Sequence, residues 1–447
     1  MSQAQRKCNV LETIFAQANI TVGACVGFER PFQTHVVQRA IKGCLDASIC
    51  GCTKVSGVGG TDACILSLRK PGERVVRTIC YPAGANISEA FQKLLDMPNS
   101  FSPATVDAVV LVEPGNNNNC RGVCFNGNHC LWDGKSIVNI IETFASLLSQ
   151  ANEGELKDVT LPSKICYEWG QLLKDNIGTP LATPAYLPID FENPGSIVTM
   201  KDIQVCFNEE KKDNYGVCDV RIDFEPELFK GILGLLRRKQ SGSLTGLLTV
   251  CLQQALGEIC LSPKSEGPNR FGTSCNIATR ILVDLRQALG NDVGRDNHIS
   301  QCFGNVIVGN TIKLLNDTDG PNILLELSKS TTLALRSRIA RGEANAASLI
   351  SSEGNFNDGQ TDHATFEISN FGIYDVGEDT VVYHTQRYEG YDGVSILTHS
   401  EKIKGVFRLG ASLMGPINPK LIATALRRTK ELFHVLLAKE NREPQLN

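Results

Sequence analysis

The chain has 447 residues, of which 42% are hydrophobic and 21% charged, with a formal net charge of −4 and a pI near 6.0. This composition is that of an ordinary globular protein, and it gives no electrostatic reason to expect binding to nucleic acid or to an anionic membrane. No run approaches ~18 consecutive apolar residues. The N-terminus has no uninterrupted apolar segment, so we expect neither a membrane span nor a secretory signal, and a cytoplasmic location.

The cysteines are abundant but follow no pattern that signals a covalent framework. There are 17 of them, an odd number with irregular spacing, and none forms a Cys-x-x-Cys pair. We therefore expect most to be reduced, small and buried, and we expect neither a disulfide framework nor a bound metal.

Helices and strands alternate along the chain, which predicts an α/β protein. An extended segment at Asn19–Phe28 precedes a helix at Thr34–Ser48. A strand pair follows at Val106–Val112 and Gly122–Asn126. We expect a polar turn at Gly115–Asn119 between these strands, because Asn and Gly tolerate left-handed backbone conformations.

The middle of the chain divides it into two parts. An amphipathic helix at Ser136–Gln150 is followed by a looser, proline-rich stretch, 151–205, which favours a crossover between domains. Beyond it we expect a helix at Pro226–Lys239, and a strongly apolar helix from Leu244 with Ser243 as its N-cap.

The C-terminal part alternates again and ends in a helix. That helix is expected to begin at Pro419, with Asn418 as its N-cap. The apolar runs between the helices predict strands at Arg280–Asp284, Asn305–Val308, Ala364–Ser369, Thr380–Tyr383, Gly393–Thr398 and Lys404–Ala411.

The candidate catalytic residues lie in the segment Asn128–Gly134, between a strand and the helix at Ser136–Gln150. A histidine at the end of a strand can reach a cavity, and its near-neutral pKa allows His129 to take a proton from a hydroxyl or amine. Asp133 can hold the turn in shape. Gly134 allows close approach of the backbone and leaves an N–H at the helix start, where an oxyanion would be stabilised.

Together with five other segments, this motif resembles a family: the CoA- or carrier-dependent acyltransferases with an HxxxD(G) motif. The family includes plant BAHD enzymes, alcohol acetyltransferases and the condensation domains of nonribosomal peptide synthetases. The resemblance covers nearly the whole chain and depends on the shared order of the segments. Besides 129–134, they are Leu11-Glu12, Ser243–Leu248, Val283–Arg286, Cys302–Asn305 and Ile368–Gly372.

The last of these segments separates the branches of the family. Ser369-Asn370-Phe371-Gly372 resembles the SNxG of the acetyltransferase and condensation branches. Plant BAHD enzymes carry DFGWG at this place, and only Phe371-Gly372 fits that motif. The resemblance therefore favours the alcohol acetyltransferase branch.

The resemblance implies a role for each site residue. His129 would be the general base, in a tunnel between two similar halves. Asp133 would pair with Arg286 and be structural, and the Gly134 N–H would bind the oxyanion. The remaining candidates, which would assist the oxyanion or shape the neighbouring loop, are Ser369, Asn370 and Asn305.

The resemblance also implies a fold and a reaction. We expect two chloramphenicol-acetyltransferase-like subdomains, each a mixed sheet flanked by helices: 1–190, with the crossover inside 151–205, and 206–447. The reaction would be acyl transfer from acyl-CoA, by default acetyl-CoA, to a small alcohol or amine acceptor by a monomeric enzyme without a metal. The apolar Cys130, Leu131 and Trp132 suggest a hydrophobic acceptor such as a terpenoid or fatty alcohol.

Other functions remain as alternatives. Within the same fold, these are amide formation with carrier-bound substrates and a binding protein without turnover. A serine hydrolase is disfavoured because no Gly-x-Ser-x-Gly elbow is present. A nucleotide-binding oxidoreductase is disfavoured because Gly57–Gly60 is followed by Thr61-Asp62, which breaks the GxGxxG pattern. The other histidines have no supporting motif, and we interpret them as non-catalytic.

Overall fold

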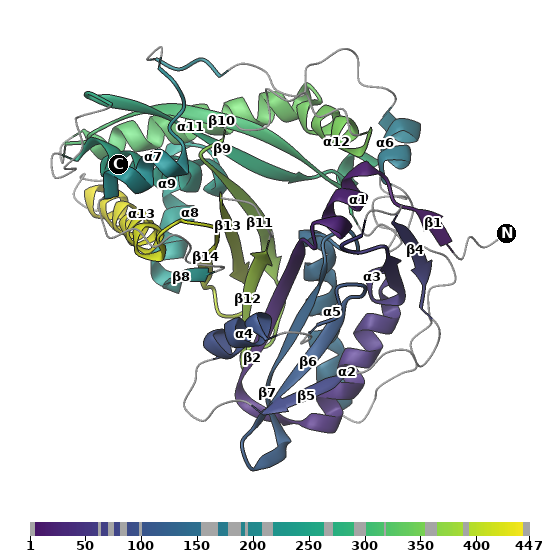
Figure 1. The fold of residues 1–447 in the computed structure, drawn as a ribbon. Coiled ribbons are helices and arrows are strands. Elements are labelled where there is room, and N and C mark those ends of the chain that lie inside the picture. The colour runs from purple at the N-terminus through teal and green to yellow at the C-terminus, as the bar shows by residue number, and fades with distance from the viewer. Residues whose placement is uncertain are drawn as a thin grey trace.

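Three β-sheets and the helices that cover them make up the fold, which is seen in a computed structural model (Figure 1). The structure describes most of the chain, with gaps. The described ranges are 5–60, 64–69, 76–80, 87–97, 101–152, 169–177, 189–192, 195–207, 218–262, 271–289, 301–316, 319–353, 364–387 and 393–440.

The first large sheet belongs mainly to the N-terminal half and has the order β12-β2-β7-β6-β5, antiparallel except for the β5–β6 pair. Side chains alternate across it, so Val110 contributes to the core under helices α2 and α5, whereas Val109 packs with α4 on the other face. The bounds are β2 (Thr21–Gln33), β5 (Arg77–Cys80), β6 (Asp107–Glu113), β7 (Asn116–Asn128), β12 (Thr380–Arg387), α2 (Thr34–Ala47), α4 (Ile87–Asp96) and α5 (Gly134–Asn152).

A small sheet of order β1-β4-β3 lies at the edge of this half. Helix α1 leads from it, and the capping box between Asn9 and Glu12 fixes where that helix begins. The elements are β1 (Gln5–Lys7), α1 (Val10–Gln17), α3 (Ile49–Cys52), β3 (Thr53–Ser56) and β4 (Ile65–Leu68).

The second large sheet belongs to the C-terminal half and has the order β10-β9-β11-β13-β14-β8. Strand β11 runs parallel to both of its neighbours, and the other pairs are antiparallel. The strands are β8 (Cys218–Phe224), β9 (Ser274–Asp284), β10 (Phe303–Lys313), β11 (Phe366–Tyr374), β13 (Gly393–Glu401) and β14 (Phe407–Met414).

Helices cover one face of this second sheet and form a core with it. Helix α9 is long and apolar enough to cross a membrane, but 78% of it is buried inside the fold, as is typical of a core helix. The helices of this half and the connecting segment are α6 (Trp169–Ile177), α7 (Met200–Phe207), α8 (Pro226–Lys239), α9 (Leu244–Leu261), the 3₁₀ helix η1 (Arg286–Leu289), α11 (Gly320–Ala340), α12 (Glu343–Glu353) and α13 (Pro419–Glu440).

Strand β12 joins the two halves. It comes from the C-terminal half of the chain but pairs along its whole length with β2, from Thr380 opposite Phe28 to Arg387 opposite Thr21. The two large sheets therefore meet at β12, and Figure 1 shows them converging there. The mixed α/β architecture with two helix-flanked sheets confirms the fold predicted from the sequence.

Several predicted boundaries are confirmed. Helix α8 has the predicted bounds, Ser243 caps α9 through the Gly246 N–H, and α13 begins at Pro419. The crossover predicted at 151–205 lies largely outside the described residues. Every cysteine whose side chain the structure describes is free, and most are buried.

Two boundaries were predicted wrongly. The asparagines expected in a turn belong to β7, which begins at Asn116, and only Pro114 and Gly115 turn the chain. Pairing with β6 and β2 outweighs the turn preference of Asn, while Gly115 takes the left-handed backbone, with φ of +77°. Strand β14 starts at Phe407 rather than at Lys404, since Lys402, Ile403 and Lys404 form the turn after β13.

Candidate active site

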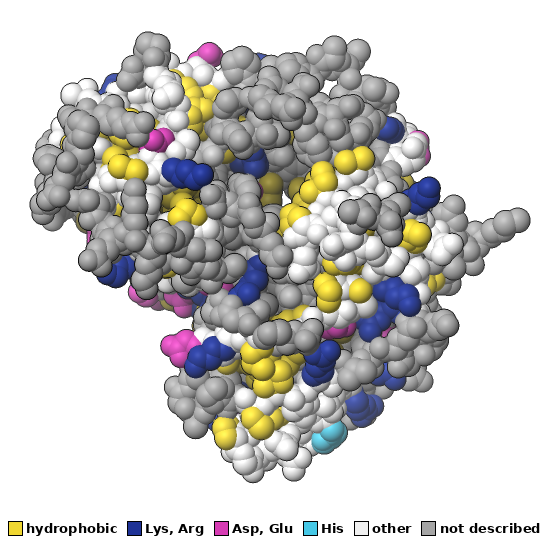
Figure 2. Space-filling view, in the orientation of Figure 1, with side chains coloured by type: hydrophobic (Ala, Val, Ile, Leu, Met, Phe, Trp, Pro, Cys, Tyr) yellow, Lys and Arg dark blue, Asp and Glu magenta, His cyan; other side chains and the backbone are white. Residues whose placement is uncertain are grey.

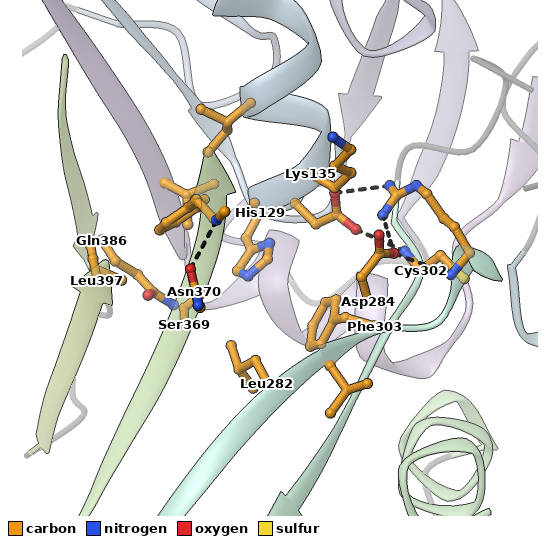
Figure 3. A pocket seen from close by; sticks show the side chains of 18 of the residues that line it. His129, Lys135, Leu282, Asp284, Cys302, Phe303, Ser369, Asn370, Gln386 and Leu397 are labelled. Carbon is orange, nitrogen blue, oxygen red and sulfur yellow. Dashed lines mark hydrogen bonds and ion pairs between the residues drawn. The ribbon is translucent and has the colours of Figure 1, made fainter. Parts of the chain in front are cut away.

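His129 is the first residue after β7, where the sequence placed it. Its N–H donates to the Ile20 carbonyl at 2.7 Å, which ties the end of β7 to the residue before β2. The side chain is 6% exposed. It lines a cavity of about 280 Å³, and the imidazole projects into this space (Figure 3).

Both halves of the chain build this cavity. The N-terminal half supplies Val22 of β2, the turn after β7 and the start of α5, and the C-terminal half supplies residues of β9, η1, β10, β11, β12 and β13. The polar residues that line it are His129, Asp133, Lys135, Asp284, Arg286, Gln287, Ser369, Asn370, Thr385 and Gln386.

The hydrogen bonding of His129 assigns its tautomer. Nδ1 lies 2.9 Å from the Trp132 carbonyl oxygen. A carbonyl can only accept, so the neutral ring carries its proton on Nδ1 and keeps the lone pair on Nε2. Nε2 forms no hydrogen bond with any residue that the structure describes. Burial lowers the pKa of His129, against the opposing effects of the Trp132 carbonyl and the Asp133 charge, which favours the neutral base.

Two phenyl rings hold the imidazole in place. Phe15 of α1 stacks on it with ring centroids 4.6 Å apart and an interplanar angle of 10°. Phe303 at the start of β10 lies near the ring as well, with centroids 5.5 Å apart. The orientation of His129 therefore depends on elements from both halves of the chain.

Asp133 is buried, and both of its carboxylate oxygens accept hydrogen bonds. Oδ1 accepts from the Ser136 N–H at 3.0 Å and from Arg286 Nη2 at 2.9 Å. Oδ2 accepts from the Cys302 N–H at 2.9 Å. Burial acts to raise the pKa of Asp133, but the Arg286 guanidinium and these hydrogen bonds hold it below its usual value. The predicted Asp133–Arg286 pair is present. His129 Nδ1 bonds to the Trp132 carbonyl and not to this carboxylate, so the contacts do not form a His–Asp relay.

Gly134 begins α5 at the wall of the cavity. A Cβ atom there would lie 2.7 Å from Cε1 of Phe371, so the close contact with that ring requires glycine. Phe371 in turn stacks on His384, with centroids 4.0 Å apart. As the first residue of the helix, Gly134 has an N–H without an intrahelical acceptor.

Ser369 and Asn370 line the cavity on β11, but their side chains are differently engaged. Asn370 accepts from the Gly372 N–H at 2.9 Å and donates to Thr245 Oγ1 at 3.3 Å. It holds the irregular register between Asn370 and Ile373. The Ser369 hydroxyl forms no hydrogen bond with the described residues, so of the two it is the available donor.

Asn305, expected to shape the loop beside the site, lies within strand β10, opposite Leu282 of β9, where the sequence predicted a strand. Its side-chain oxygen is buried and has no hydrogen-bond partner among the described residues. The neighbouring Gly304 explains part of the motif, because a Cβ atom there would lie 2.0 Å from the Ala344 carbonyl of α12. Asn305 does not line the cavity.

Sequence reasoning missed several residues of the site. Gln301 is completely buried, and its amide donates to the His129 carbonyl. Thr385 and Gln386 reach the cavity from β12. Phe15 stacks on the His129 imidazole from α1. All of these contacts join residues more than 100 positions apart, and no local pattern in the sequence signals them.

The apolar residues beside His129 do not face the cavity. Cys130, Leu131 and Trp132 are completely buried in the N-terminal core. The prediction of a hydrophobic acceptor rested on these three residues, and they cannot contact an acceptor in the cavity.

Among the described residues, no cluster of His, Cys, Asp or Glu is arranged to hold a metal ion. On the face shown in Figure 2, Lys and Arg side chains are scattered and do not form one patch.

Comparison with known proteins finds similarity in structure alone. No family model matches the sequence, and no curated protein matches it. The trichothecene 15-O-acetyltransferase TRI3 from Fusarium sporotrichioides matches with a TM-score of 0.66 at 11% identity, over 97% of this chain and 95% of that one. Polyketide synthase associated protein 5 from Mycobacterium tuberculosis has the same TM-score and identity, over 97% of this chain and 98% of that one.

Condensation enzymes are also among the similar structures. The first condensation domain of the calcium-dependent antibiotic synthetase has a TM-score of 0.59 at 11% identity, over 98% of this chain and 97% of that one. The condensation enzyme VibH has a TM-score of 0.54 at 13% identity, over 95% of this chain and 92% of that one. This chain shares the fold of the acetyltransferase, of polyketide synthase associated protein 5 and of the condensation enzymes over nearly its whole length.

Proposed function

We propose that this protein is an acyl-CoA-dependent O-acyltransferase with His129 as general base. One observation carries the proposal: the Nε2 lone pair of a neutral histidine is available in a cavity between the two halves. Enzymes of this fold include an O-acetyltransferase and condensation enzymes, which supports a reaction that transfers an acyl group.

The reaction is a direct transfer between two bound substrates. Nε2 of His129 removes the proton of the acceptor hydroxyl as its oxygen attacks the thioester carbonyl. The resulting oxyanion accepts hydrogen bonds from the Gly134 N–H and the Ser369 hydroxyl. Collapse of the tetrahedral intermediate breaks the carbon–sulfur bond, and the imidazolium returns the proton to the departing thiolate. The products are an ester and free CoA, and no covalent acyl-enzyme forms.

Asp133 and Arg286 act as positioning residues in this scheme. Their ion pair holds the turn that follows His129 against the C-terminal half. The donor is acyl-CoA, with acetyl as the default acyl group, and the acceptor is a small alcohol. We also propose that the enzyme is a cytoplasmic monomer.

The test uses purified full-length protein with acetyl-CoA, longer acyl-CoAs and a pooled panel of alcohols and amines. Acylated products and free CoA are followed by liquid chromatography and mass spectrometry, because 17 cysteines would give background with a thiol dye. His129→Ala is compared with His35→Ala, which changes an exposed histidine of α2. We expect product with the wild type and with His35→Ala, and a rate lower by a factor on the order of 10²–10⁴ in His129→Ala.

The outcomes separate the possible functions. Product that survives His129→Ala would rule out the proposed general base. Turnover only with acyl groups on a carrier protein would support the condensation-type alternative. Lack of turnover with every donor would favour a binding protein of the same fold.

A further inference from the structure

The cavity that contains His129 opens to solvent at a rim and is closed where β12 meets the second large sheet. The exposed residues of its lining mark the rim, and they are Lys135, Asp284, Gln287, Asn370 and Gly372. The lining residues from β12 and β13 are almost completely buried, with Leu397 3% exposed and Thr385 2% exposed. These buried residues form the closed end of the cavity.

This geometry divides the two substrates of the proposed reaction. Acyl-CoA carries a nucleotide, which a cavity of about 280 Å³ cannot enclose together with an acceptor. The nucleotide therefore remains at the rim, and the acetyl group reaches His129 from there. Figure 3 shows His129 between Lys135 on one side and Gln386 and Leu397 on the other. The closed end is thus left to the acceptor.

A single row of residues crosses the second large sheet at this closed end. In the register of the sheet, Ser369 of β11 is followed by Leu397 of β13, Gly410 of β14 and Arg221 of β8. Register partners lie on the same face of a sheet, about 4.8 Å apart from strand to strand. Ser369 lines the cavity with His129, whereas Gly410 and Arg221 line a second cavity of about 10 Å³, enough for one water molecule.

Leu397 separates the two cavities. Of the residues that the structure describes, it is the one that lines both. Its neighbour in the row, Gly410, has no side chain to fill the space behind it. A Cβ atom at Gly410 would lie 3.7 Å from the Leu397 carbonyl oxygen and 3.9 Å from Cγ of Arg221, which are ordinary van der Waals distances. The wall between the cavities is therefore the Leu397 side chain.

The second cavity is polar, unlike the side chain that closes it off. Nη1 and Nη2 of Arg221 and Nε2 of His399 are buried and have no hydrogen-bond partner among the described residues. The Arg221 guanidinium lies 3.7 Å from Asp219 and 4.5 Å from the centre of the Tyr383 ring, so its charge is compensated. Buried polar atoms without a partner are costly, and a hydroxyl group could satisfy them because it both donates and accepts.

We propose that Leu397 is the end wall of the acceptor site and limits the acceptor to a short alcohol. The acceptor extends from His129 toward β13, and its far end packs against the Leu397 side chain and does not reach Arg221. This inference rests on the proposed acyl transfer, and it names the size class of the acceptor. Leu397 determines specificity in this scheme and takes no part in the proton transfer at His129.

The test measures kcat/KM of the full-length protein for the straight-chain alcohols from ethanol to 1-octanol, with acetyl-CoA as donor. We expect the wild type to accept alcohols up to a limiting length, beyond which each further carbon lowers kcat/KM by about tenfold or more. Leu397→Ala shortens the wall, so its limit should rise by about two or three carbons. Leu397→Phe thickens the wall and should lower the limit. An unchanged limit in both variants would overturn the inference.

Leu413→Ala is the matched control. Leu413 is a buried leucine of the neighbouring strand β14, but it packs into the C-terminal core on the other face of the sheet. The same loss of packing there should leave the limiting length unchanged, and an equal shift would overturn the assignment to Leu397. If Leu397→Ala does not fold, Leu397→Val makes a smaller change in the same direction and should raise the limit by a smaller amount.

A second measurement tests what lies behind the wall. Each alcohol longer than the wild-type limit is compared with the diol in which a hydroxyl replaces the terminal methyl group. In Leu397→Ala this hydroxyl can reach Arg221 and His399. The ratio of kcat/KM for the diol to that for the alcohol should therefore exceed the wild-type ratio by about threefold to tenfold. An equal ratio in the two proteins would overturn the placement of Leu397 between the cavities.

Equilibrium binding distinguishes this inference from the proposed function. The same alcohols are titrated without a donor by isothermal titration calorimetry, which gives a limiting length that does not depend on turnover. If the wild type acylates alcohols and no variant changes the limit, the inference fails and the acyltransferase stands. If no alcohol is acylated but the binding limit shifts in Leu397→Ala and Leu397→Phe, the end wall stands and the proposed reaction fails.

Discussion

Arg286 and Asp133 form a buried ion pair that joins the two halves of the molecule, with Nη2 of the arginine 2.9 Å from Oδ1 of the aspartate. The two residues are 153 positions apart in the chain. Arg286 also donates to the Ser136 hydroxyl at 3.2 Å and to Asp284 at 3.0 Å. The pair thus fixes the start of α5, and with it the turn that follows His129, against the end of β9.

Breaking this pair should destabilise the protein strongly. Arg286→Met leaves the Asp133 carboxylate buried without its cation, and we expect the free energy of unfolding to fall by about 3–5 kcal/mol. Urea denaturation measures this. Asp284→Asn is the matched control, because Asp284 is the more exposed partner of the same arginine. We expect this substitution to lower the free energy of unfolding by less than about 1 kcal/mol. Equal effects of the two substitutions would contradict the prediction.

The activity should depend on pH through the neutral form of His129. Because burial lowers its pKa, the base is unprotonated at neutral pH and becomes protonated only below its usual value of 6.5. We expect kcat/KM to be constant above about pH 7 and to fall as the pH is lowered through the reduced pKa. Rates are measured between pH 5 and 8.5, together with the folded fraction at each pH. An inflection above pH 7 would contradict this assignment.

The sequence predicted the features that depend on local chemistry. Caps and apolar periodicity located α8, α9 and α13, and the local pattern placed His129 between a strand and a helix. The order of short motifs predicted the fold and the pairing of Asp133 with Arg286. Local patterns carry no information about contacts between distant parts of the chain. The Asp133–Arg286 pair was therefore predicted from the resemblance and not from periodicity.

What could not be predicted depends on tertiary contact. The pairing of β12 with β2 brings Thr385 and Gln386 to the cavity. The sequence of their segment predicts a strand but does not indicate which strand it pairs with.

Gly134 should not tolerate a side chain while Phe371 holds its position. In Gly134→Ala the new methyl group would overlap the Phe371 ring, whose Cε1 lies 2.7 Å from the ideal Cβ position. We expect a loss of about 1–3 kcal/mol of stability and a lower kcat. The double variant Gly134→Ala with Phe371→Leu should recover part of the lost stability and part of the lost kcat. Both quantities are compared with those of Phe371→Leu alone. Full activity in Gly134→Ala would contradict the close packing described here.

Gln301 should act on His129 as a positioning residue. Its amide donates to the His129 carbonyl, and its Nε2 lies 3.5 Å from Nδ1 of the same residue. Gln301→Leu removes the hydrogen bond, so we expect kcat to fall with little change in KM. Because Leu adds no charge, the inflection in the pH–rate profile should stay where it is.

Gln301→Glu separates positioning from simple support of the fold. The new carboxylate would lie beside Nδ1, where a negative charge favours the protonated imidazolium and raises the pKa of His129. A protonated histidine cannot act as the base, so the inflection in kcat/KM should move to higher pH, by about 1–3 units for a close charge pair. The comparison of the Leu and Glu variants decides the role of Gln301. If both give the same inflection as the wild type, Gln301 does not act on the imidazole.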